Sequence, residues 1–143
     1  MSAPSGAPFN AQFNLPVRVY YQDTDAGGVV FHARYLDFME RARTELLNAR
    51  GFDLARFADE SRILFMVHGI TVRYHRPARL NDLLVATARA ASLGPASVEF
   101  EQRVERGPDL LVEGRVRLAL VDRDRQRPVR MPAVLRQILE TSG

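Results

Sequence analysis

The chain has 143 residues, 46% of them hydrophobic and 26% charged, which is typical of a single globular domain and leaves no room for a second domain of ordinary size. No apolar run approaches the roughly 20 residues that cross a bilayer, and the lack of cysteine excludes disulfides, zinc–thiolate sites and a cysteine nucleophile. All basic residues are arginines scattered among acidic ones, with a net charge of +3 and no basic stripe for nucleic acid. We therefore expect a cytoplasmic protein with no membrane insertion and no nucleic-acid partner.

Residues 1–14 mix Ser, Pro, Gly, Ala and Asn with single Phe residues. They lack both the charged start and the apolar stretch of a signal peptide. We expect residues 1–14 to form a disordered N-terminal tail and residues 15–143 to form one domain.

Residues 15–22 alternate between apolar and polar side chains, with Val17, Val19 and Tyr21 on one face. This two-residue period predicts a half-buried first strand. The following residues 23–28 read Asp-Thr-Asp-Ala-Gly-Gly, and these residue types favour turns, so they predict a loop.

From Phe31 the apolar residues change to spacings of three and four, as in Tyr35, Met39, Ala42 and Leu46. That spacing predicts a helix of about four turns, in a stretch rich in helix-forming residues. Gly51 stands where a left-handed residue would end the helix. The segment that follows, around residues 52–57, carries no comparable pattern.

Most of the remaining chain to about residue 122 reads as strand, with turns at residues 93–95 and 107–109. The expected strands are residues 63–74, 83–91, 98–104 and 110–121. Pro132 can open a short last helix over residues 133–139. Because strands follow one another through short turns, this order predicts an α+β fold: an antiparallel sheet with one long helix laid across it.

The densest cluster of polar, small and ionisable residues spans residues 20–32. In it, Asp25 precedes the helix, and two glycines allow close approach of a ligand to the backbone. A helix N-terminus offers unpaired N–H groups and a partial positive charge, which can bind a carbonyl oxygen as it becomes an oxyanion. This combination suits acyl transfer or hydrolysis without a metal. Asp and Gly between a strand and a helix also serve as turn and cap residues, so that alternative stays open.

The runs at residues 17–45 and 70–82 resemble the signature of the 4-hydroxybenzoyl-CoA thioesterase family, and most of all its YbgC branch, the acyl-CoA thioesterases associated with the Tol-Pal system. The resemblance covers about residues 15–135. It implies a hotdog fold, in which a five-stranded antiparallel sheet wraps around one long central helix. It also implies dimers that join edge to edge, dimers or tetramers in solution, an active site at the dimer interface, and hydrolysis of acyl-CoA thioesters to free acid and coenzyme A with no cofactor and no metal.

Carried over by this resemblance, Asp25 is the nucleophile or the general base, and the motif does not decide between them. The resemblance also implicates His32, whose backbone N–H would hold the thioester carbonyl, and Tyr21; Asp23 would support the loop. From the residues alone, a histidine near a helix start is more often a surface or capping residue, and Tyr21 could be a core aromatic. The other two histidines, at positions 68 and 75, have no carboxylate at an obvious spacing, so we assign them structural roles.

For coenzyme A, the resemblance implies phosphate contacts by Arg125, Arg127 and Arg130 after the last strand, with a solvated charged turn as the alternative. A second basic patch of the family is replaced here by residues 93–97, Leu-Gly-Pro-Ala-Ser. The expected partners are an acyl-CoA substrate and, as a further candidate, an acyl carrier protein. One rival function is a scaffold that binds acyl thioesters without hydrolysis; a hotdog dehydratase is a second rival, although residues 21–32 do not resemble that family's motif. Acyl-chain preference stays open.

Overall fold

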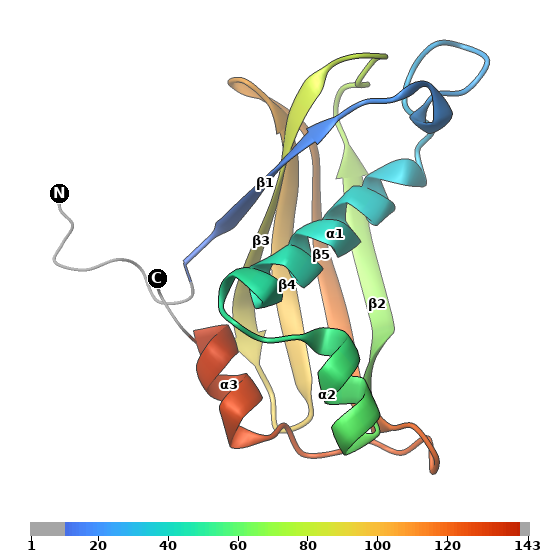
Figure 1. The fold of residues 1–143 in the computed structure, drawn as a ribbon. Coiled ribbons are helices and arrows are strands. Elements are labelled where there is room, and N and C mark those ends of the chain that lie inside the picture. The colour runs from blue at the N-terminus through green and yellow to red at the C-terminus, as the bar shows by residue number, and fades with distance from the viewer. Residues whose placement is uncertain (1–10, 141–143) are drawn as a thin grey trace, which may run out of the picture.

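The computed structural model describes residues 11–140, and its main feature is one sheet of five strands in the order β1-β3-β4-β5-β2 (Figure 1). Every neighbouring pair of strands is antiparallel, as the sequence predicted. The strands are β1 (Phe13–Arg18), β2 (Ile63–Tyr74), β3 (Leu83–Leu93), β4 (Ser97–Arg106) and β5 (Asp109–Asp122).

The N-terminal boundary of the sheet differs from the expectation. Residues 1–10 of the expected tail lie outside the described residues, but Phe13 and Asn14 already belong to β1, opposite Ala88 and Thr87 of β3. The predicted strand also ends early, at Arg18 instead of residue 22.

The chain leaves the sheet after β1 because a 3-10 turn, η1 (Tyr21–Asp23), interrupts the extended backbone. The Asp23 carboxylate accepts a hydrogen bond from the Tyr20 N–H at 2.8 Å, and the Asp23 N–H donates to the Tyr20 carbonyl at 2.9 Å. Tyr21 therefore no longer alternates into the core, and its side chain is 82% exposed.

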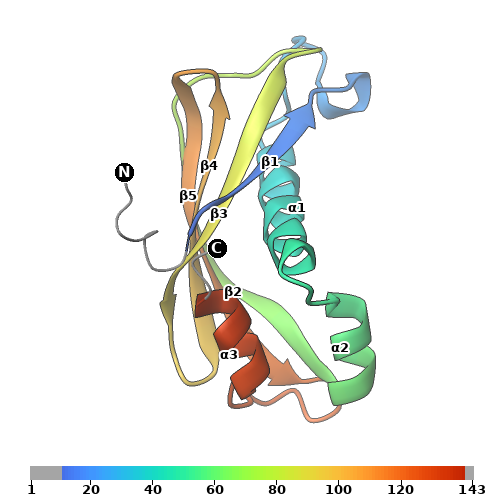
Figure 2. The same ribbon diagram turned by 60° about the vertical axis from the view of Figure 1, so that its left-hand side comes forward.

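Three helices accompany the sheet: α1 (Arg34–Ala49), α2 (Leu54–Ser61) and α3 (Ala133–Glu140). The sequence predicted one long helix and a short C-terminal one, so α2 was missed. Its start is capped by the Asp53 carboxylate, which accepts from the Arg56 N–H at 3.1 Å. Figure 2 shows α1 lying against one face of the sheet, where it contacts β1, β3 and β4.

Helix α1 buries the face that its sequence spacing predicted, with Met39, Ala42 and Leu46 fully inaccessible to solvent. Phe38 is buried beside them. The helix ends at Ala49 with Arg50 as its C-cap, and Gly51 follows with a φ of +79°, the left-handed conformation expected there.

A polar residue, Gln102 of β4, lies at the centre of the contact between α1 and the sheet and is fully buried. Its amide donates to the Met39 carbonyl at 2.9 Å and to the Thr87 carbonyl at 3.0 Å, and its oxygen accepts from Arg43 at 2.8 Å. Burial lowers the pKa of the Arg43 guanidinium from its usual value. These bonds tie helix α1 to two strands.

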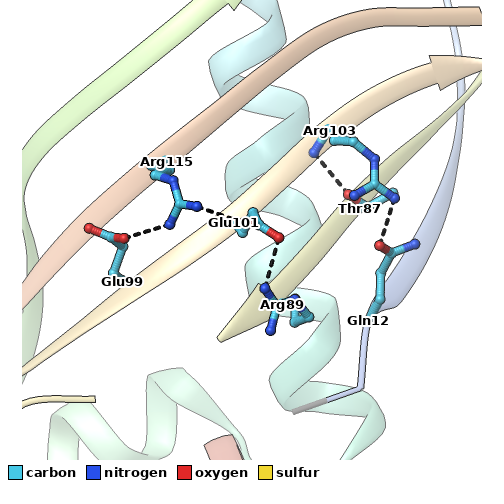
Figure 3. A network of polar contacts seen from close by, with 7 residues as sticks. All are labelled: Gln12, Thr87, Arg89, Glu99, Glu101, Arg103 and Arg115. Atoms are coloured by element: carbon cyan, nitrogen blue, oxygen red, sulfur yellow. Dashed lines mark hydrogen bonds and ion pairs between the residues drawn. The ribbon is translucent and has the colours of Figure 1, made fainter. Parts of the chain in front are cut away.

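The opposite face of the sheet carries side chains of alternating sign that pair with one another (Figure 3). Glu101 accepts from Arg89 and from Arg115, each at 2.8 Å, and Arg115 also bonds to Glu99 at 2.8 Å. The hydrogen bond from Arg89 is the main reason that the pKa of Glu101 lies below its usual range. This face is therefore wet and charged.

Strand β2 forms one edge of the sheet and, within residues 11–140, pairs with β5 alone. Its ladder is interrupted by a bulge between Val67 and Gly69. Several large apolar side chains on it are about half exposed: Met66, Val67, Ile70 and Tyr74. An edge of 12 residues with this composition is unusual for a chain that stays alone.

Candidate active site

Asp25 lies in a small hairpin loop between η1 and α1, at the end of the molecule drawn uppermost in Figure 1. Thr24 and Val30 form an antiparallel bridge, and the Asp25 N–H donates to the Val29 carbonyl at 2.9 Å. Gly28, with a φ of +79°, donates back to the Asp25 carbonyl and closes the turn. The short turn holds Asp25 on the surface.

The Asp25 carboxylate is only half engaged by its own loop. Its Oδ1 accepts from the Gly27 N–H at 2.8 Å, whereas its Oδ2 makes no hydrogen bond to any residue between 11 and 140. The side chain is exposed. One oxygen orients the carboxylate while the other can meet a substrate or a water molecule.

The base of the loop is held by Asp23, which is 3% exposed. Its backbone carbonyl accepts from the Phe31 N–H at 3.0 Å, and its buried Oδ1, which accepts no hydrogen bond from residues 11–140, faces the Arg34 Nε at 3.4 Å. On the other side, the Val30 N–H donates to the Ala78 carbonyl at 2.8 Å. Asp23 therefore supports the loop, as the sequence predicted.

His32 lies between this loop and α1, exposed to solvent. Its ring centroid is 4.4 Å from that of Phe31 and 6.4 Å from that of Tyr74, whose ring is nearly perpendicular at 88°. The Tyr74 hydroxyl donates to the His32 carbonyl at 2.9 Å. His32 and Tyr74 border a hollow of about 270 Å³, which is also lined by Val30, Tyr35, His75, Arg76 and Pro77.

The start of α1 carries no side-chain cap. The N–H groups of Phe31 and Arg34 are used in backbone hydrogen bonds, but those of His32 and Ala33 make none to the part of the chain that the structure describes. These two adjacent donors, at the N-cap Ala33 and at the residue before it, are therefore open beside the positive end of a 16-residue helix. Such donors can bind an oxygen that carries, or acquires, negative charge.

The structure places the predicted catalytic residues Tyr21, Asp25 and His32 at the same end of the molecule, within one segment of the chain. No hydrogen bond or ring contact joins any two of them within residues 11–140. The exposure of Tyr21 excludes the alternative that it is a core aromatic.

The three predicted coenzyme A contacts, Arg125, Arg127 and Arg130, are exposed and follow β5 at the opposite end of the molecule (Figure 1). Asp122 organises this loop, since its carboxylate accepts from the Arg125 N–H at 2.8 Å and its N–H donates to the Arg127 carbonyl at 2.8 Å. A single chain therefore does not bring these arginines to Asp25.

A hollow of about 520 Å³ near that same end, beside the turn between β3 and β4, was not predicted from the sequence. His68, at the bulge of β2, lies on its wall together with Ser92, Ser97 and Arg117. These residues come from four strands, so only the strand register could have brought them together. For the same reason the sequence missed the partner of His75, whose Nε2 lies 2.6 Å from Glu113 of the neighbouring strand.

A smaller slot of about 140 Å³ opens between α1, α2 and the sheet. Its wall is mostly apolar, and charged side chains stand at α1: the lining residues are Glu40, Arg43, Thr44, Leu47, Leu54, Phe65, Val67, Phe100 and Leu118. A hydrocarbon group would be favourably buried there.

No group of three or more His, Asp or Glu side chains within residues 11–140 is arranged to hold a metal ion. The same part of the chain contains no helix long and apolar enough to span a bilayer.

This architecture, an antiparallel five-stranded sheet with a helix against one face and a carboxylate loop leading into the uncapped start of that helix, is a hotdog fold. Residues 27–113 match the model of the thioesterase superfamily, and the chain belongs to that superfamily.

Proteins of similar sequence and structure support this assignment. The chain is 43% identical over 120 residues to "Acyl-CoA thioesterase YbgC" of Haemophilus influenzae, covering 84% of this chain and 88% of that one. It is 44% identical over 121 residues to "Acyl-CoA thioester hydrolase YbgC" of Escherichia coli O6:H1, covering 84% and 90%. Among solved structures, a probable thioesterase from Bartonella henselae is similar with a TM-score of 0.81 and 36% identity, over 85% of this chain and 100% of that one.

Proposed function

We propose that this chain hydrolyses acyl-CoA thioesters to a free acid and coenzyme A, the reaction that the names of its YbgC relatives describe. The observation that carries the proposal is the placement of an exposed carboxylate, Asp25, in a short loop that leads directly to two open N–H donors at the start of α1. A thioester carbonyl bound by those donors would present its carbon to the loop.

Two routes fit this geometry. As a general base, Asp25 takes a proton from water while the water oxygen attacks the carbonyl carbon. As a nucleophile, its free Oδ2 attacks the carbon, the carbon–sulfur bond breaks, and water then hydrolyses the mixed anhydride. In both routes the carbonyl electrons move onto the oxygen held by the His32 and Ala33 N–H groups, and coenzyme A leaves as the thiolate and takes up a proton. We propose catalytic roles for His32 and Tyr21 as well, because both lie at the same end of the molecule as Asp25.

The site becomes complete in a dimer. Two copies that pair through β2 would place the strands antiparallel across a two-fold axis, because an isologous contact uses the same edge twice. This pairing reverses one copy, so the end that holds Arg125, Arg127 and Arg130 would approach the Asp25 loop of the other. The long free edge and the half-exposed apolar residues of β2 support this pairing. The arginines would then bind the phosphates of coenzyme A. We propose that the assembly is a dimer or a tetramer and that it acts in the cytoplasm.

The test is release of free thiol from short-chain, long-chain and hydroxybenzoyl-CoA. Because the chain has no cysteine, a thiol reagent reports only the coenzyme A that is set free. We expect Asp25→Asn to keep the fold and to lower kcat at least 100-fold, since the amide keeps the shape of the carboxylate but loses its basicity. The matched control is Asp59→Asn, an exposed aspartate on α2, which should hydrolyse at the wild-type rate.

Unchanged turnover by Asp25→Asn would remove that residue from the mechanism. If the wild type releases no thiol from any acyl-CoA but binds acyl carrier protein or the thioesters tightly, the alternative function, a scaffold without hydrolysis, replaces this proposal.

A further inference from the structure

We infer that Tyr74, at the end of β2, is a positioning residue of this site: its hydroxyl sets the orientation of the His32–Ala33 peptide, whose N–H is one of the two open donors. This inference rests on the proposed function. Its observation is the 2.9 Å hydrogen bond from the Tyr74 hydroxyl to the His32 carbonyl.

The Tyr74 ring is itself held in place by the core. Its centroid lies 5.8 Å from that of Tyr35 at an interplanar angle of 63°, an edge-on contact of the kind aromatic pairs favour. Tyr35 is 3% exposed, packs on Phe38, and accepts a hydrogen bond from the Ala78 N–H at 2.9 Å. Tyr74 thus links the buried Tyr35 ring to the exposed His32–Ala33 peptide.

A trans peptide is planar, so its C=O and N–H point in opposite directions. Because Tyr74 fixes the His32 carbonyl toward β2, the Ala33 N–H is aimed away from β2. The preceding peptide is fixed differently: the Phe31 carbonyl accepts from the Arg34 N–H at 2.8 Å, which aims the His32 N–H by backbone alone. Within residues 11–140, Tyr74 is the only side chain hydrogen-bonded to either peptide.

The hydroxyl acts on this donor in two ways. It restricts rotation of the peptide before substrate binds, and preorganised donors are what stabilise a developing oxyanion. It also polarises the amide, and such chains of hydrogen bonds strengthen each member by roughly 10–30%. Deleting an oxyanion donor outright costs about 100- to 1,000-fold in kcat. Removing only its orienting bond leaves the donor present, so we expect about a tenfold loss.

The kinetic test is Tyr74→Phe, which removes the hydroxyl and keeps the ring. We expect kcat for acyl-CoA hydrolysis to fall about tenfold with KM within a factor of two, because the donor acts mainly on the transition state. The melting temperature and the oligomeric state should stay as in the wild type. The matched control is Tyr20→Phe, an exposed tyrosine at the same end that bonds to neither peptide and should leave kcat unchanged.

A spectroscopic test reads the peptide directly. The chain contains one His–Ala pair, His32–Ala33, so protein labelled with carbonyl-¹³C histidine and ¹⁵N alanine gives a single correlation between this carbonyl and this N–H. Loss of the hydrogen bond in Tyr74→Phe should move the carbonyl resonance upfield and shift the Ala33 amide, while Tyr20→Phe leaves both in place.

Three results would overturn the inference: an unmoved carbonyl resonance, a shifted resonance with wild-type kcat, or a loss of kcat accompanied by an equal loss of folded or assembled protein. These are distinct from failure of the proposed function. If the wild type hydrolyses acyl-CoA but Tyr74→Phe is equally fast, only the role of Tyr74 is refuted; if the wild type hydrolyses none, the proposed function falls and the role of Tyr74 with it.

Discussion

Replacing Gln102 by Met tests how much the buried polar junction between α1 and the sheet stabilises the fold. The side chain is fully buried and makes three hydrogen bonds, to Met39, Thr87 and Arg43. Two neutral bonds contribute about 1 kcal/mol each and the bond from the guanidinium about 1.5–3 kcal/mol. Methionine has a similar shape and regains about 1 kcal/mol through apolar burial. We therefore expect a net loss of roughly 3 kcal/mol in the free energy of unfolding.

Urea denaturation at one fixed protein concentration would measure this loss, since the stability of an oligomer depends on concentration. Arg43→Met should cost less than Gln102→Met, because it removes one bond and also relieves the buried guanidinium of its desolvation. Both single variants lose the same bond between Arg43 and Gln102. The double variant should therefore lose about 1–2 kcal/mol less than the sum of the two single losses. A Gln102→Met protein within about 0.5 kcal/mol of the wild type, or strictly additive losses, would show that the junction contributes little.

Two further predictions concern stability. The Arg89 hydrogen bond depresses the pKa of Glu101, so the stability that the Glu101 carboxylate contributes is fully present above the ordinary glutamate pKa of about 4.3 and is lost as pH falls through the lower pKa of the folded state. In urea titrations, Glu101→Gln should therefore show a smaller fall in the free energy of unfolding between pH 6 and pH 3 than the wild type. An identical pH dependence would refute the role of this ion pair. Tyr35→Phe leaves the Ala78 N–H without its acceptor and should cost about 1–2 kcal/mol by the same titration at neutral pH, whereas an unchanged midpoint would mean that another acceptor replaces the hydroxyl.

The sheet and α1 could be predicted because their signals are periodic over long stretches. Alternation over residues 98–104 and the three- and four-residue spacing in α1 both survived into the structure. Two predictions were wrong, and both concern short segments: the end of the first strand and helix α2. Alternation continued through Tyr21, but one carboxylate, Asp23, bonded to the Tyr20 N–H and turned the backbone. Helix α2 has only eight residues and no fully buried side chain, so its apolar pattern was too short to read, although Asp53 is a recognisable cap.

In the candidate site, too, some contacts could be predicted from the sequence and others could not. Asp25, its glycines and the helix start are contiguous in sequence, so their juxtaposition could be predicted. Tyr74 lies 42 positions from His32, and only the tertiary fold brings its hydroxyl to that carbonyl. The pairing of His75 with Glu113 likewise depends on the register between β2 and β5. Contacts of this kind are set by strand register, which a single sequence does not specify.

The uncapped start of α1 has a consequence for anyone who engineers this protein. A side chain that capped the helix would ordinarily add about 1 kcal/mol of stability. Here a capping side chain at position 33 would accept from the Tyr35 or Leu36 N–H and would stand beside the Ala33 N–H, one of the donors that a substrate carbonyl needs. Variants selected only for heat resistance should therefore accumulate Ser, Thr or Asp near this position. Their melting temperature should rise while kcat falls, so the start of α1 is a place where higher thermal stability lowers turnover.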